Sequence, residues 1–184
     1  KQLWSSGVGG GGEKLRLALG LAKDGDTLFV ASRDGDVRAL DAASGSTRWQ
    51  AKTKADLSAG PGVGSGLVVV GTSGGAIIAL EAASGKQRWK ATTSGEVLAA
   101  PLVADDRVVV RSVDGRLRAF GAADGKELWM VEDTVPGLTL RGTAPPVCEQ
   151  TNPAPNSAAT SGSAGSWPPQ VSLIRSAPAA QACL

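Results

Sequence analysis

The chain has 184 residues, of which 42% are hydrophobic and 4% aromatic, and its formal net charge is +2. Charges of both signs are scattered singly, which argues against binding to nucleic acid or to an anionic membrane surface, and no apolar run approaches the roughly 20 residues of a spanning helix. Histidine is absent, so the usual general base, the commonest metal ligand and the Ser/His/Asp and Cys/His arrangements are excluded. We therefore expect no catalytic residues, no metal ligands and no cofactor.

The first segment with a structural pattern is residues 2–8, which contains Trp4. It is expected to form a single outermost strand. The three strands that should precede it in the same sheet are not found in this sequence, so we expect this strand to belong to an adjoining, incomplete unit.

From residue 27 the sequence repeats every 40 residues without insertion. Each copy contains a short apolar run, a turn pair with glycine, an alanine-rich segment that ends in glycine, and a tryptophan. In chain order, the apolar runs are residues 28–30, 68–70 and 108–110; the turn pairs are 34–35, 74–75 and 114–115; the alanine-rich segments are 39–45, 79–85 and 119–125; and the tryptophans are Trp49, Trp89 and Trp129. A repeat of this length indicates a solenoid or a propeller.

Each copy is expected to form strands, because β-branched or alternating runs are separated by glycine pairs that favour tight turns. In the third copy the predicted strands are residues 97–104, 107–112, 116–121 and 126–133. Four antiparallel strands in about 40 residues predict one blade of a β-propeller. The expected fold is all-β: about three four-stranded blades, single strands of the adjoining blades, and an irregular C-terminal tail.

The repeated alanines and tryptophans have a packing explanation. Small residues let one blade approach the next, and a large tryptophan on the outer strand fills the remaining gap, where its burial contributes a few kcal/mol, on the order of 2–3. We therefore interpret Trp4, Trp49, Trp89 and Trp129 as structural. The alternative is that these rings stack on a ligand.

The segment that reads Ala-Leu-Asp-Ala-Ala-Ser-Gly in the first copy, followed four residues later by Trp49, resembles the tryptophan-docking motif of quinoprotein-type propellers. Lys86 and Lys126 fill that motif's lysine position in the second and third copies, whereas Ser46 replaces it in the first. The resemblance implies that Gly45, Gly85 and Gly125 help to dock neighbouring blades. It implies a fold and says almost nothing about function.

Residues 135–145, together with 57–63 and 68–72, are similar to the BamB family of lipoprotein scaffolds in the outer-membrane β-barrel assembly machinery. The resemblance covers roughly residues 2–147. It implies a non-catalytic scaffold at the periplasmic face of the outer membrane, where Leu138, Leu140 and Arg141 bind the periplasmic domains of the assembly channel. Unfolded outer-membrane proteins are a further expected partner, and membrane contact is expected only through a lipid anchor outside residues 1–184.

The residues themselves are compatible with this implication. Leu138 and Leu140 alternate with Thr139, so both leucines would lie on one face of an extended strand. Arg141 follows directly and offers a planar fork for a carboxylate or carbonyl, and apolar anchors beside an arginine are typical of interface hot spots. The alternative is that both leucines are core residues in the inner strand of a fourth blade.

Two other functions remain open. A fragment of a quinone-dependent dehydrogenase would share the tryptophan-docking repeat, but it would need a cation site, a catalytic aspartate and often adjacent cysteines. The aspartates at 34, 114 and 124 lie in turn pairs, where turn geometry accounts for them. A sensor or adaptor propeller would use the same repeat for binding.

The composition divides the chain into residues 1–147, a partial propeller with repeats near 27–66, 67–106 and 107–146, and residues 148–184. The second part is rich in Pro, Ser, Ala and Gly, and only Glu149 and Arg175 are charged. It is expected to be disordered, because it offers too little apolar surface to offset its ordering entropy. The break at Cys148 favours a reading-frame shift after Val147; a native low-complexity tail is the alternative.

Overall fold

The computed structural model describes residues 4–7 and 18–132. The predicted tail at 148–184 lies outside these residues. Thirteen strands are described: β1 (Ala18–Leu19), β2 (Leu21–Asp24), β3 (Thr27–Ala31), β4 (Asp36–Asp41), β5 (Thr47–Lys52), β6 (Leu57–Gly64), β7 (Leu67–Thr72), β8 (Ala76–Glu81), β9 (Gln87–Thr92), β10 (Leu102–Ala104), β11 (Arg107–Arg111), β12 (Arg116–Gly121) and β13 (Glu127–Glu132).

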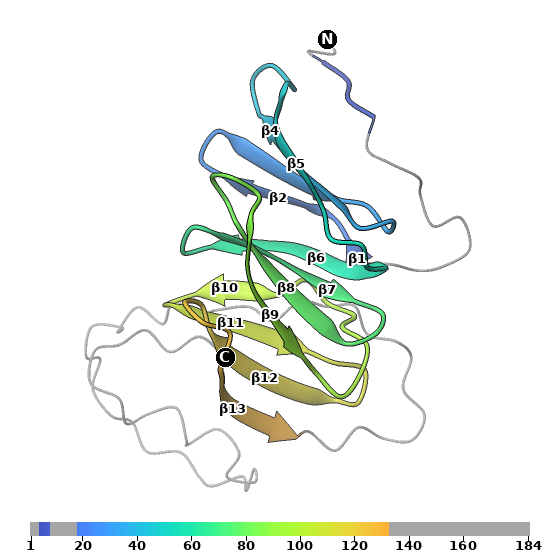
Figure 1. Cartoon of the computed structure of the whole chain (residues 1–184), viewed down its shortest axis with the longest axis vertical. Helices are drawn as coiled ribbons and strands as arrows, with labels where there is room; N and C mark the ends of the chain where they lie inside the picture. The colour runs from blue at the N-terminus through green and yellow to red at the C-terminus, as the bar shows by residue number, and fades with distance from the viewer. Residues whose placement is uncertain (1–3, 8–17, 133–184) are drawn as a thin grey trace, which may run out of the picture.

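These strands form three sheets arranged one after another along the long axis of the molecule (Figure 1). Blade 1 is β2-β3-β4-β5, blade 2 is β6-β7-β8-β9 and blade 3 is β10-β11-β12-β13, each with antiparallel neighbours in chain order. The two-residue strand β1 adds to blade 2 by pairing in parallel with β6. The prediction of four-stranded, propeller-type blades is therefore confirmed.

The three copies share one register. Trp49, Trp89 and Trp129 each lie opposite the first alanine of the alanine-rich segment, and the pairing of the third and fourth strands shifts by one residue directly after it. The extra residue in the outer strand sits just before the tryptophan, at Arg48, Arg88 and Leu128. The strand pairing and the bulge therefore repeat every 40 residues, as the sequence does.

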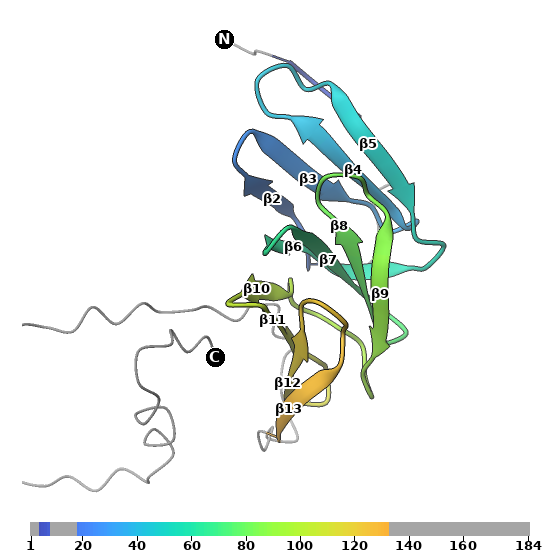
Figure 2. The same ribbon diagram turned by 60° about the vertical axis from the view of Figure 1, so that its left-hand side comes forward.

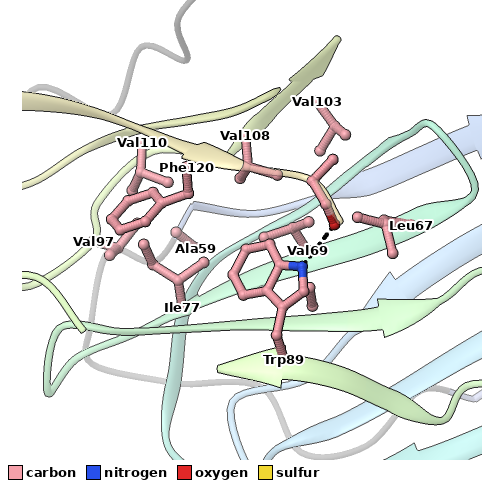
Figure 3. Close-up of a cluster of buried hydrophobic side chains, with 12 residues drawn as sticks. Ala59, Leu67, Val69, Ile77, Trp89, Val97, Val103, Val108, Val110 and Phe120 are labelled. Carbon is pink, nitrogen blue, oxygen red and sulfur yellow. Dashed lines mark hydrogen bonds between the residues drawn. The ribbon is translucent and has the colours of Figure 1, made fainter. Parts of the chain in front are cut away.

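The core lies between the blades. One cluster joins blade 1 to blade 2, where Phe29, Val37 and Ala39 pack against Val68, Val70, Ile78 and Leu80. A second joins blade 2 to blade 3, where Trp89, Val69 and Ile77 lie against Val108, Val110 and Phe120 (Figure 3). Every residue of β7 is buried, because blade 2 is covered on both faces by its neighbours (Figure 2).

The predicted first strand of blade 3 at residues 97–104 is too long. The structure has only Leu102–Ala104 as a strand, and Val97 makes an isolated bridge to Ser112. Pro101 stands between the two pairings and has no N–H to donate to a ladder. Backbone pairing is therefore interrupted ahead of Leu102.

Inner strands of adjacent blades approach each other closely. A Cβ added to Gly62 in β6 would lie 1.8 Å from the carbonyl oxygen of Pro101, and one added to Gly64 would lie 2.3 Å from that of Val103. The glycines in β6 are therefore needed to let the inner edges of blades 2 and 3 meet.

Candidate functional site

A tryptophan at each junction donates a hydrogen bond to the next blade. The donor is the indole Nε1–H, and the acceptor is a backbone carbonyl in the alanine-rich segment after the third strand of the next blade. The three bonds join Trp4 to Ala42 (3.1 Å), Trp49 to Ala82 (2.8 Å) and Trp89 to Ala122 (2.7 Å; Figure 3). The indole satisfies its polar N–H at the same time as it buries its ring.

Each of these rings lies directly on a glycine. Gly45, Gly85 and Gly125 have φ values of +72°, +72° and +70°, in the left-handed region that glycine adopts without a Cβ penalty. A Cβ at any of them would lie 2.5 Å from an atom of the docked indole. The turn therefore requires glycine for its positive φ, and the docked ring requires glycine because it leaves no space for a Cβ.

These contacts place Trp49 and Trp89 between blades and Trp4 against blade 1, each with its ring on a glycine of that blade. Residues 4–7 form no strand, so the outermost strand predicted over residues 2–8 is not observed in the part of it that the structure describes.

Trp129 holds the same register in β13. A residue after Glu132 on which Trp129 could dock would lie outside the described residues. The docking role of Trp129 stays a prediction.

The outer rim of blade 1 carries a polar cluster. The Arg48 guanidinium donates to the Asp41 carboxylate at 2.6 Å, and Ser44 donates to the same carboxylate through both its backbone N–H and its hydroxyl. The hydrogen bond from Arg48, followed by those from Ser44, holds the pKa of Asp41 well below its usual range. The cluster is exposed, so it orders the turn between β4 and β5 more than it stabilises the fold.

A second cluster joins the connection between blades 2 and 3 to blade 3 itself. Arg118, whose side chain is only 9% exposed, donates to the Ser94 hydroxyl at 2.9 Å, and Ser94 in turn donates to Asp114. Burial opposes ionisation of Asp114, but hydrogen bonds from Ser112, Ser94 and the Arg116 N–H outweigh it and lower the pKa of this carboxyl. Arg116 also lies 3.2 Å from Glu132.

The charges of this second cluster are neutralised within it, so it joins loops rather than presenting a reactive group. Sequence reasoning missed it. The available signal was that Arg38 and Arg118 occupy the same position of the repeat. Arg38 also contacts another segment, because it donates to the Gly7 carbonyl at 2.9 Å.

The predicted partner-binding residues Leu138, Leu140 and Arg141 lie outside the described residues. Within residues 4–7 and 18–132, no group of three or more metal-ligating side chains is close enough to hold a metal ion. The same residues include no helix long and apolar enough to cross a membrane.

Comparison with solved structures defines the class of fold. The chain is similar to BamB from Moraxella catarrhalis, with a TM-score of 0.66 and 30% identity over 72% of this chain and 40% of that one. A europium-containing methanol dehydrogenase is also similar, with a TM-score of 0.54 and 26% identity over 64% of this chain and 25% of that one. Together with the tryptophan docks, these likenesses make the chain a β-propeller protein of the quinoprotein-repeat type.

Sequence comparison gives the family. Residues 33–160 match the family described as outer membrane protein assembly factor BamB, and the chain belongs to that family. Curated members include proteins from Pseudomonas aeruginosa, 44% identical over 69 residues, and Burkholderia pseudomallei, 38% identical over 71 residues. The matches cover 38% and 39% of this chain and 18% of each relative, so the similar region is under a fifth of the relatives' length.

Proposed function

We propose that this protein is a non-catalytic scaffold in the assembly of outer-membrane proteins. The observation that carries the proposal is the match of residues 33–160 to a family named for that role. The curated relatives from Pseudomonas aeruginosa and Burkholderia pseudomallei bear the same name. A scaffold needs a rigid body with an exposed docking surface, and blades locked by tryptophan docks supply the rigid body.

The docking surface in this proposal is formed by Leu138, Leu140 and Arg141, and its partner is the periplasmic part of the membrane-embedded assembly channel. Two apolar side chains on one face of an extended segment supply desolvated contact area. The adjacent guanidinium supplies a directional, charge-assisted bond. On this proposal the protein works at the periplasmic face of the outer membrane.

Quinone-dependent oxidation is the second candidate, because the methanol dehydrogenase is similar to this chain at 26% identity. The assembly factor from Moraxella catarrhalis is similar at higher TM-score and identity, and this difference favours the scaffold. A blade repeat shared with an enzyme is evidence for a shared fold, whereas an enzymatic function depends on the residues of an active site.

The scaffold proposal is tested by titrating the full chain with the purified periplasmic domains of the channel. Replacing Arg141, Leu138 or Leu140 by Ala should each weaken binding by about 1–3 kcal/mol if these are hot spots. The Arg141→Ala variant should melt at an unchanged temperature, because an exposed arginine contributes little to stability.

The matched control is Arg111→Ala, which removes an exposed arginine from β11 and should bind normally. If the leucines are core residues, their variants should instead lose about 2–5 kcal/mol of folding stability. Full binding by a folded Arg141→Ala variant, with both leucine variants unfolded, would refute the proposed docking surface.

A further inference from the structure

Met130 is the single methionine of the chain, and it lies in β13, the outermost strand of blade 3 (Figure 1). The residue is 45% exposed. It occupies a repeat position that is polar in the other two copies, Gln50 in blade 1 and Lys90 in blade 2. Because oxidation of methionine depends on access to the sulfur, a thioether at this position is open to soluble oxidants.

The sulfur of Met130 lies against a buried positive charge. Arg118 is the pairing partner of Met130 across β12 and β13, and it is only 7% exposed. Its Nη2 donates to Met130 Sδ at 3.5 Å and to Ser94 Oγ at 2.9 Å. A thioether sulfur is a weak acceptor, so one of the bonds made by this buried guanidinium is a poor one.

The same guanidinium has a donor that no hydrogen bond satisfies. Within the part of the chain that the structure describes, the buried Nε of Arg118 has no hydrogen-bond partner. Glu127 Oε2, which forms an ion pair with it, lies 3.7 Å away, beyond hydrogen-bond distance. A buried cation in these surroundings favours a stronger acceptor in place of the sulfur. One oxygen atom bonded to Sδ would be such an acceptor.

Blade 1 shows that the repeat accepts a polar group opposite this arginine. Arg38 occupies the position of Arg118, and its pairing partner in β5 is Gln50. The amide of Gln50 donates to Asp36 at 3.1 Å. A glutamine side chain is close to methionine sulfoxide in length and polarity, and the two blades share one register and one bulge. Oxidation of Met130 would therefore give blade 3 a polarity that blade 1 already has.

We propose that Met130 is a reversible oxidation site and that Arg118 binds its sulfoxide. The oxidant is a soluble peroxide. With hydrogen peroxide, a sulfur lone pair attacks one oxygen, an S–O bond forms, the O–O bond breaks, and the second oxygen takes the remaining proton and leaves as water. The sulfur loses two electrons, which the peroxide gains. Methionine sulfoxide reductases reverse the step: two thiols become a disulfide and the oxygen leaves as water.

Oxidation would change one surface position of blade 3 and leave its backbone pairing intact. The apolar thioether, two residues from the exposed Leu128, would become a dipolar group. Its oxygen would accept from the guanidinium that also binds Ser94, in the connection between blades 2 and 3. The chain would thus respond to an oxidant with a change in surface polarity and keep its fold. This inference does not depend on the scaffold function, because no partner protein takes part.

Access to the sulfur is tested by treating the full chain with hydrogen peroxide, folded and in urea, and following the peptide that contains Met130 by mass spectrometry. Since the chain has one methionine, no second thioether competes. The folded chain should react within about fivefold of the rate in urea, because the residue is half-exposed. A slower reaction would overturn the proposal. Both epimer-specific reductases together, with a thiol, should restore the parent mass, and a sulfoxide that persists would overturn its reversibility.

Binding of the sulfoxide by Arg118 is tested by the change in Tm on oxidation. The matched control is the variant Lys90→Met/Met130→Gln, which moves the methionine to the same repeat position of blade 2, where its pairing partner is Ile78. Oxidation should shift the Tm of the parent upward relative to that of the control by about 2–5 °C, because only the parent gains a charge-assisted bond. Equal changes in Tm would overturn the role of Arg118.

A second pair of variants keeps this role testable if the control does not fold. Met130→Gln places a carbonyl oxygen opposite Arg118 without oxidation, whereas Met130→Leu places none there. The glutamine variant should melt about 2–5 °C above the leucine variant, since the leucine variant leaves the guanidinium without an acceptor at this position. A leucine variant that melts as high as the glutamine variant would overturn the binding of the sulfoxide by Arg118.

Discussion

Each described junction between blades depends on one tryptophan, one glycine and one alanine carbonyl. The tryptophan supplies buried area and a hydrogen-bond donor, the carbonyl accepts that bond, and the glycine provides both the positive φ and the space for the ring. These residues could be predicted from the sequence because they recur every 40 positions. Their pairing across blades could not be predicted residue by residue, because it depends on how one sheet faces the next.

At the residue scale, the dock can be tested at Gly85, which lies under Trp49. Gly85→Ala should lower the free energy of unfolding by about 2–4 kcal/mol, since the new Cβ meets both the left-handed backbone and the indole. Gly66→Ala is the matched control, with the same φ of +72° and no atom within 4 Å of the added Cβ. It should cost only about 1–2 kcal/mol. Equal losses in urea denaturation would contradict the docking role of Gly85.

At the scale of strands, the sequence predicted blade 3 well where pairing is local. The observed β12 (Arg116–Gly121) matches its predicted range, and β11 and β13 agree with theirs to within a residue at each described end. The inner strand was overestimated because Pro101 interrupts it, and the parallel pairing of β1 with β6 was not predicted. Both features arise at the inner edge, where contacts between sheets outweigh the alternating pattern along one strand.

The inner edge gives the prediction at this scale. Gly62→Ala should destabilise the fold by more than about 3 kcal/mol, because the added Cβ would lie 1.8 Å from the Pro101 carbonyl oxygen and a whole strand must shift. Gly74→Ala, in the turn before β8, is the control, since nothing lies within 4 Å of its added Cβ; its effect should be within about 1 kcal/mol of zero. A Gly62→Ala variant as stable as the control would show that the inner strands are not tightly opposed.

At the scale of the whole molecule, the described blades are joined by tryptophan docks and buried clusters, and we expect function to depend on the side chains that their surface presents. The predicted docking segment came from family resemblance, because two leucines and an arginine in an extended stretch read equally well as core. The exposure of Leu128 and Met130 was not predicted. Apolar residues in a strand are normally assigned to the core, and only the exposure of Leu128 and Met130 in columns that are polar elsewhere identifies them as surface.

The central claim, that this protein docks on the assembly channel through residues 138–141, is tested most directly by site-specific photo-crosslinking in living cells. A photoreactive amino acid replaces Arg141 in one strain and Ala83, in the exposed turn of blade 2, in the other. We expect irradiation to link position 141 to the channel protein and to leave position 83 unlinked. Crosslinks from position 83 but none from position 141, with both proteins present at equal levels, would contradict the claim.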